Sequence, residues 1–183
     1  MEPQASRHAL TFIFISMLVD TIGLGIVLPV TPQLITELTH QGMSEAARWG
    51  GWLFFVFALM QFLCSPLIGN LSDRFGRRPV LIASLAMLGV DYLITGFAPT
   101  IAWLFVGRFL SGIAGAAYTT ANAYIADVSP PEKRAANFGL VSAAFGIGFV
   151  IGPAVGGLLG EFGARVPLYV SAGIAFCNAL YGL

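Results

Sequence analysis

Gly69-Asn70-Leu71-Ser72-Asp73-Arg74-Phe75-Gly76-Arg77-Arg78-Pro79 is a compact charged stretch between two long apolar segments. The flanking residues 49–72 and 79–90 contain no Asp, Glu, Lys or Arg. We therefore expect a short polar loop that links two membrane helices. Because Lys and Arg accumulate on the cytoplasmic side of membranes, the three arginines predict that this loop faces the cytoplasm.

The composition favours a membrane protein over a soluble one. Of the 183 residues, 57% are hydrophobic and 10% are charged, whereas an average soluble domain has roughly 25% charged residues. The formal net charge is zero, so the sequence gives no reason to expect a nucleic-acid partner.

Six segments are long and apolar enough to cross a bilayer, which requires about 20 residues. We expect one transmembrane domain over residues 1–183, with spans at about 9–34, 49–69, 79–98, 101–126, 135–160 and 166–183. Residues 38–48 are expected to form the one sizeable outer loop. A cytoplasmic N-terminus places Arg7 and the basic residues of 74–78 and 133–134 inside, with only Arg48 and Arg165 outside. This asymmetry supports that orientation.

Four polar side chains are expected near the middle of the membrane. At about 1.5 Å per helical residue, Asp20, Asp91 and Arg108 lie at similar depth, and Gln61 lies near them. Charge inside a membrane is costly, so these residues are candidates for a proton or ligand site. The alternative is a buried charge pair that only holds helices together.

The segment 101–126 carries a small and polar face. Arg108, Gly112, Gly115, Thr119 and Asn122 share one side of the expected helix. Arg108 and Asn122 favour a polar cavity on this side. The glycines alone are equally consistent with close packing between helices.

The segment 135–160 carries a different face, made of small residues at every fourth position. Its members are Ala144, Gly148, Gly152, Gly156 and Gly160. Such a ridge lets another helix approach closely. Pro153, beside this ridge, is expected to bend the helix.

These patterns resemble the major facilitator superfamily of transporters. The charged stretch is similar to the family signature between helices two and three through its residues Gly69, Asp73, Arg74, Gly76, Arg77 and Arg78. Residues 104–112 look like the family's helix-four motif, and residues 148–157 look like the helix-five motif of its antiporters. Within the superfamily the chain looks most like the tetracycline/proton antiporters. The stretches that carry this resemblance are 20–25, 28–30, 58–61 and 91–92.

The resemblance implies the first half of a twelve-helix transporter, an all-α integral membrane fold of six helices in two inverted three-helix repeats. It implies proton-coupled export of a tetracycline-type drug by alternating access, with a missing C-terminal six-helix half as partner. The energy source is then the proton gradient, with no cofactor, and the substrate can travel as a metal chelate. The location implied is the bacterial cytoplasmic membrane.

The resemblance also assigns residues to roles. The proton and substrate candidates are Asp20, Gln61, Asp91, Arg108, Thr119 and Asn122. The cytoplasmic gating loop comprises Gly69, Asp73, Arg74, Gly76, Arg77 and Arg78, with Asp127 as its partner in a charge network. The helix-five packing motif comprises Gly148, Gly152, Pro153, Gly156, Gly157 and Gly160.

Two other functions stay open. The same scaffold can carry another small solute, such as a sugar or metabolite, because fold does not fix cargo. The chain can also be a truncated membrane fragment that transports nothing. An enzyme is not expected, because the sequence shows neither metal-ligand spacing nor a nucleophile with a nearby base.

Overall fold

The computed structural model describes residues 3–183, except for the side chains of residues 3–8 and Ala117. The predicted cytoplasmic side chain of Arg7 therefore lies outside the described part. Helices make up nearly all of this part, and no strand occurs within it. In chain order the helices are α1 (Pro3–Val27), α2 (Thr31–Thr39), α3 (Met43–Phe75), α4 (Arg77–Gly96), α5 (Ile101–Gly115), α6 (Ala117–Val128), the 3-10 turn η1 (Pro131–Lys133), α7 (Arg134–Gly160) and α8 (Val166–Tyr181).

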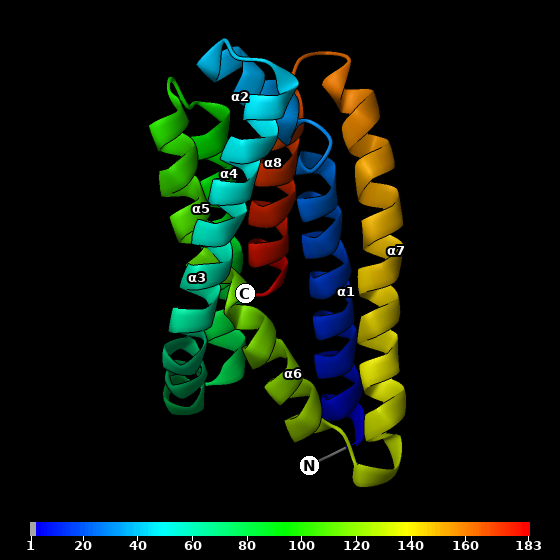
Figure 1. Cartoon of the computed structure of the whole chain (residues 1–183). Helices are drawn as coiled ribbons and strands as arrows, with labels where there is room; N and C mark the ends of the chain where they lie inside the picture. The colour runs from blue at the N-terminus through cyan, green and yellow to red at the C-terminus, as the bar shows by residue number, and fades with distance from the viewer. Residues whose placement is uncertain (1–2) are drawn as a thin grey trace.

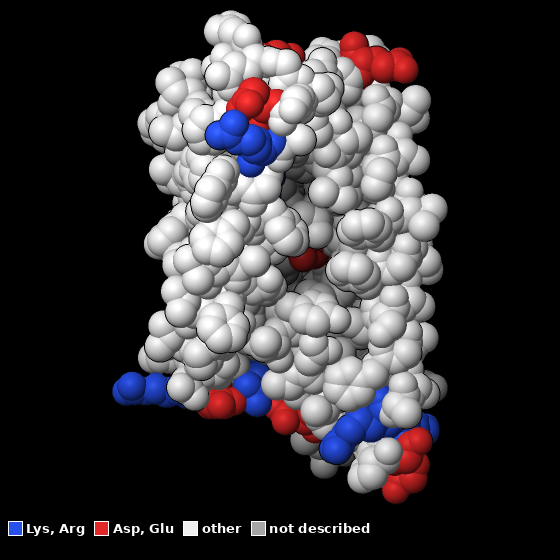
Figure 2. All heavy atoms as spheres, in the orientation of Figure 1, with Lys and Arg blue, Asp and Glu red and all other residues white. Residues whose placement is uncertain are grey.

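The long helices run side by side, as a membrane bundle requires (Figure 1). Five segments of the described chain are long and apolar enough to cross a membrane, namely Ala9–Val27, Met43–Phe75, Arg77–Gly96, Ile101–Val128 and Pro131–Gly160. The sixth, α8, is apolar but has only 16 residues. Charged side chains gather at the two ends of the molecule, with a nearly uncharged band between them (Figure 2). The chain is an all-α integral membrane protein.

The helix pairings agree with the internal repeat that the family resemblance implies. α1 packs on α7, and α3 packs on α5. α4 packs on α5, and α8 packs on α1. Suppose that α1 is exchanged with α5–α6, α3 with α7, and α4 with α8. The α1–α7 pair then becomes the α3–α5 pair, and the α4–α5 pair becomes the α1–α8 pair. The α4–α8 pair becomes itself. Two three-helix units are thus related by an internal two-fold, as expected for inverted repeats.

The first predicted span needs correction, because α1 ends at Val27 and residues 28–30 form a turn. Pro29 cannot continue the helix, since it lacks an N–H group and clashes with the preceding turn. Pro32 instead occupies the first turn of α2, where a missing N–H costs nothing. The expected outer loop over 38–48 is also wrong: α2 reaches Thr39 and α3 begins at Met43.

The charged stretch that we expected to be a loop is mostly helix. α3 continues through Phe75, and α4 begins at Arg77. Only Gly76 separates the two helices, with φ of 96°. Glycine adopts this conformation without the steric penalty that a Cβ imposes. The turn is therefore a single residue.

The expected fourth helix is interrupted at Ala116, which separates α5 from α6. α6 leaves the direction of the bundle and crosses its lower part obliquely (Figure 1).

The small-residue face of α7 packs directly on α1. A Cβ atom on Gly148 would lie 2.8 Å from Thr21 Cβ, and one on Gly152 would lie 2.6 Å from Gly25 Cα. One on Gly160 would lie 2.9 Å from Val30 Cγ1. Contacts this short leave no room for a side chain, so the backbones of α1 and α7 approach each other closely over residues 148–156, while Gly160 contacts the Val30 side chain just beyond α1.

Two further residues of this helix behave differently from each other. A Cβ on Gly156 would collide with the backbone of Ile26, whereas one on Gly157 would meet nothing within 4 Å. Pro153 lies inside α7 and contacts Gly25 of α1 through its ring. The tight contact with α1 therefore depends on one side of α7 only.

Candidate functional site

A cavity of about 420 Å³ lies among α1, α3, α4, α5, α6 and α7. Most of its lining is apolar, and the polar side chains that line it are Asp20, Gln61, Ser84, Ser111 and Tyr118. Asp20 is the one charged residue among them. Figure 2 shows an acidic side chain deep in a hollow between the two charged ends. The cavity is thus a mid-membrane site with a single carboxyl group in an apolar wall.

Gln61, which lines this cavity, bonds to the backbone next to the break between α5 and α6. Its Nε2 atom donates a hydrogen bond of 3.1 Å to the carbonyl of Gly115. Gly115 is the last residue of α5 and also lines the cavity. Gln61 therefore joins α3 to the start of the oblique segment.

Asp91 lies behind the cavity and does not line it. The residue is 1% exposed, and its Oδ1 accepts a 3.2 Å hydrogen bond from Thr95 Oγ1. The missing side chain of Gly107 on α5 leaves room for this carboxyl group. Its Oδ2 has no hydrogen-bond partner among the described residues.

Arg108 is half-buried on α5 and lies within electrostatic range of Asp91. Neither residue lines the cavity that contains Asp20. The expected set of three charges is therefore divided: Asp20 faces the cavity, while Asp91 and Arg108 lie outside it on the neighbouring helices α4 and α5.

The remaining residues of the expected polar face have local roles. Thr119 Oγ1 donates to the carbonyl of Ala116 at 2.6 Å, and Asn122 Nδ2 donates to the carbonyl of Tyr118 at 3.0 Å. Neither side chain lines the cavity. A Cβ on Gly112 would lie 2.6 Å from the carbonyl oxygen of Phe57, so this glycine serves close packing on α3.

Tyr92, which is 2% exposed, carries part of the family resemblance but was not among the candidate site residues. A Cβ on Gly23 would lie 3.7 Å from its hydroxyl oxygen, so the ring reaches α1 one turn beyond Asp20. Asp20, Asp91 and Arg108 are all within electrostatic range of this hydroxyl, which has no hydrogen-bond partner in residues 3–183 as described. Its position beside Asp91, within an apolar segment, is the feature of the sequence that could have indicated a buried polar group here.

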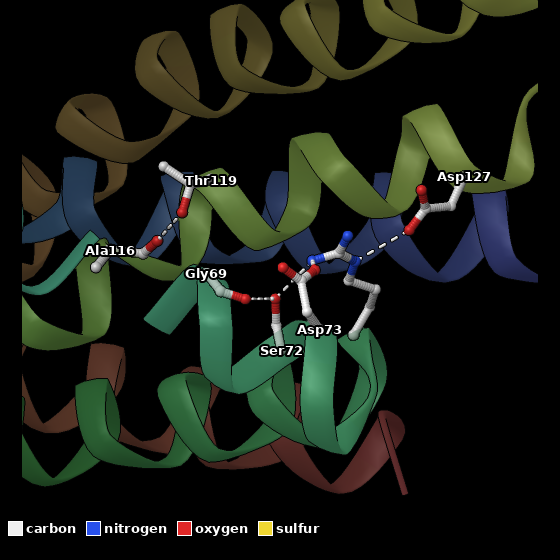
Figure 3. A network of polar contacts seen from close by, with 7 residues as sticks. Gly69, Ser72, Asp73, Ala116, Thr119 and Asp127 are labelled. Carbon is white, nitrogen blue, oxygen red and sulfur yellow. Dashed lines mark hydrogen bonds and ion pairs between the residues drawn. The ribbon is translucent and has the colours of Figure 1, made fainter. Parts of the chain in front are cut away.

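The charges around the α3–α4 turn meet at Arg77, and Figure 3 shows its partners Ser72, Asp73 and Asp127 close together. Its Nε donates to Asp127 Oδ2 at 3.0 Å, and its Nη1 donates to Ser72 Oγ at 2.7 Å. Nη1 also forms an ion pair with Asp73 at 2.5 Å. Ser72 Oγ in turn donates to the carbonyl of Gly69 at 2.8 Å. Arg77 therefore connects the end of α3 to the end of α6.

The other arginines of this stretch point elsewhere. Arg78 Nε donates to the carbonyl of Gly182 at 2.8 Å, and its guanidinium lies over the ring of Phe12. Arg74 lies over the ring of Phe75. Arg78 thus anchors the end of α8, and the three arginines have three different surroundings.

Comparison with known proteins agrees with this architecture. Residues 13–183 match the family model described as Major Facilitator Superfamily. The chain belongs to the major facilitator superfamily. A solved structure of a bacterial homologue of the human lysosomal transporter Spinster, inward-facing and unoccupied, superposes with a TM-score of 0.82 over 100% of this chain and 43% of that one. At 20% sequence identity, this likeness shows the shared fold.

Curated members of the superfamily are closer in sequence. The chain is 45% identical over 177 residues to the class C tetracycline resistance protein of Escherichia coli, covering 97% of this chain and 44% of that protein. It is 33% identical to multidrug resistance protein 1 of Bacillus subtilis, and this match covers 95% of this chain and 44% of that protein. The superfamily to which the chain belongs comprises transporters and not enzymes. The chain spans less than half of the length of these two relatives.

Proposed function

We propose that this chain forms the N-terminal half of a proton-coupled transporter that exports a tetracycline-type drug. The observation that carries the proposal is the single carboxyl group of Asp20 in the wall of a largely apolar mid-membrane cavity. The identity to tetracycline resistance proteins supports the choice of cargo.

The chemistry follows from the two states of this carboxyl group. When protonated, Asp20 is neutral and matches the apolar wall. When a cationic group or a metal chelate enters, the ionised carboxylate is favoured and the proton leaves. Proton and substrate therefore oppose each other at one site, which is a negative coupling between two ligands. Alternating access then carries each to the opposite side of the membrane.

The other residues have supporting roles in this proposal. Gln61 contacts substrate from α3, and the carboxyl group of Asp91, with the half-buried Arg108 in electrostatic range, is a second candidate for proton binding behind the cavity. Arg77 with Asp73 and Asp127 closes the cytoplasmic side in one state and separates in the other. Thr119 and Asn122 reach the substrate only if α6 moves.

Orientation and assembly belong to the same proposal. The N-terminus lies in the cytoplasm of a bacterium, and the basic end of the bundle faces inward. A second six-helix half completes the cavity, because two bodies have to rock around a central site.

The test is substrate-driven proton release in inverted membrane vesicles that contain the transporter. Asp20→Asn should abolish tetracycline-driven proton movement, because the amide cannot bind or release the proton. Glu37→Gln removes a carboxylate from the exposed surface of α2 and should leave the movement unchanged.

Undiminished proton movement in Asp20→Asn would remove Asp20 from the mechanism. If the parent protein responds to metabolites but to no cationic or amphipathic drug, another small solute is the cargo. No movement of any solute, even with a second half present, would identify a non-transporting fragment.

A further inference from the structure

α6 connects the cavity to the cytoplasmic charge network. Its first turn follows Gly115 and contains Tyr118, both of which line the cavity. Its last turn carries Asp127, which accepts a hydrogen bond from Arg77. With 12 residues at about 1.5 Å each, the helix covers about 18 Å between these ends.

At the cavity end of α6, a side chain replaces the backbone donor of a helical hydrogen bond. In a continuous helix the carbonyl of Gly115 would accept from the amide of Thr119, four residues on. Here the Thr119 amide bonds to the carbonyl of Ala116 at 3.2 Å instead. The side-chain amide of Gln61 takes its place and donates to Gly115 at 3.1 Å. The interruption at Ala116 is therefore supported by a side chain of the cavity wall.

The middle of α6 is buried in one of the two apolar core clusters of the described chain. Ala121 and Ile125 are almost completely buried, in a cluster with Ile13 and Met17 of α1 and Leu81 of α4. Because α6 is one uninterrupted helix, a displacement of its cavity end also displaces Asp127 at its other end.

We infer that Gln61 is a positioning residue that couples occupancy of the cavity to the Arg77–Asp127 contact through α6. This inference rests on the proposed function. The side-chain amide of Gln61 has one N–H that Gly115 does not use and one acceptor oxygen. An oxygen-rich substrate that binds these groups and turns the amide toward the cavity breaks the bond to the Gly115 carbonyl. Release of that carbonyl lets α6 pivot at Ala116 and shifts Asp127 relative to Arg77. Because coupling is reciprocal, loss of the Arg77 contact also changes substrate affinity.

Amide hydrogen exchange of the protein in lipid nanodiscs tests this coupling without any substrate. Gln61→Met keeps the length of the side chain and removes its hydrogen bond. It should raise exchange over residues 117–128 about fivefold, the effect of losing one neutral hydrogen bond. Arg77→Ala should raise it from the other end. The double variant should show less than the product of the two effects, because the two sites act on one element.

Matched controls separate coupling from general loosening. Ser84→Ala alters the same cavity wall from α4 and should leave exchange in α6 unchanged. Gln61→Leu replaces Gln61→Met if the latter does not fold. Tetracycline, added to the parent protein, should change exchange in α6, and this response should be lost in Gln61→Met.

Parental exchange at residues 123–128 in Gln61→Met, or single effects that multiply in the double variant, would overturn the inference. If the substrate-free results hold and the parent does not respond to tetracycline, the coupling stands and the proposed cargo is wrong.

Discussion

At the scale of single residues, one side of α7 has no room for a side chain, whereas the other side has. Gly156 faces the backbone of Ile26, whereas Gly157, its neighbour in sequence, faces open space. We expect Gly156→Leu to destabilise the bundle by at least the roughly 1–3 kcal/mol typical of overpacking. Gly157→Leu should cost less than about 1 kcal/mol, near the cost of an ordinary surface substitution. Thermal unfolding in detergent measures both, and equal losses would contradict the assigned contact.

The hydroxyl of Tyr92 gives a second prediction at this scale. It is buried and has no partner in the described chain, whereas Ser171 Oγ donates a 3.0 Å hydrogen bond to the carbonyl of Gly23 nearby. Tyr92→Phe should therefore leave stability unchanged or raise it, because an unpaired buried group only costs desolvation. Ser171→Ala should lose about 1 kcal/mol, the net contribution of a typical hydrogen bond. A larger loss in Tyr92→Phe, by the same unfolding assay, would reveal a bond to that hydroxyl.

At the scale of elements, the one-residue turn at Gly76 determines what each arginine can reach. Arg77, directly after the turn, contacts both α3 and α6. Arg74, on the last turn of α3, contacts only the ring of Phe75 among the interactions described. Arg77→Ala should lower stability by about 1 kcal/mol relative to Arg74→Ala, since its partners Asp73 and Asp127 are more than half exposed. The difference should shrink in 1 M salt, where the screening length is about 3 Å.

The elements also show where sequence reasoning succeeded and failed. The apolar segments and the glycine ridge are local patterns, so their existence was predictable. The ends of helices were harder to predict. The charged stretch is polar, yet it stays helical up to Gly76. Pro29 interrupts an apolar segment that hydropathy alone predicts to be one continuous helix. Counting residues along each helix predicted that Asp20 and Asp91 lie at the same depth in the membrane. That count does not predict which way each side chain points. The space left by Gly107 decides that Asp91 points away from the cavity.

At the scale of the whole molecule, the positions of the charged ends predict how the chain lies in a membrane. Ser44 and Glu132 are both exposed, one near the start of α3 and the other in η1 at the opposite end. In a background of Cys64→Ser and Cys177→Ser, we expect Ser44→Cys to react with an impermeant maleimide in intact cells. Glu132→Cys should react only in inverted vesicles. The unsubstituted background should not react, and the reverse pattern would invert the proposed orientation.

The contact between α1 and α7 has a consequence for how such a molecule can change over generations. Its closest approaches are made by backbone at Gly25, Gly152 and Gly156, where no larger residue fits. The cavity wall is instead made of side chains from six helices, and most of them touch no such contact. The residues that form the α1–α7 contact and the residues that line the cavity therefore occupy separate positions. Substitutions in the cavity wall can therefore accumulate one at a time and reshape the cavity, while the contact between α1 and α7 stays intact.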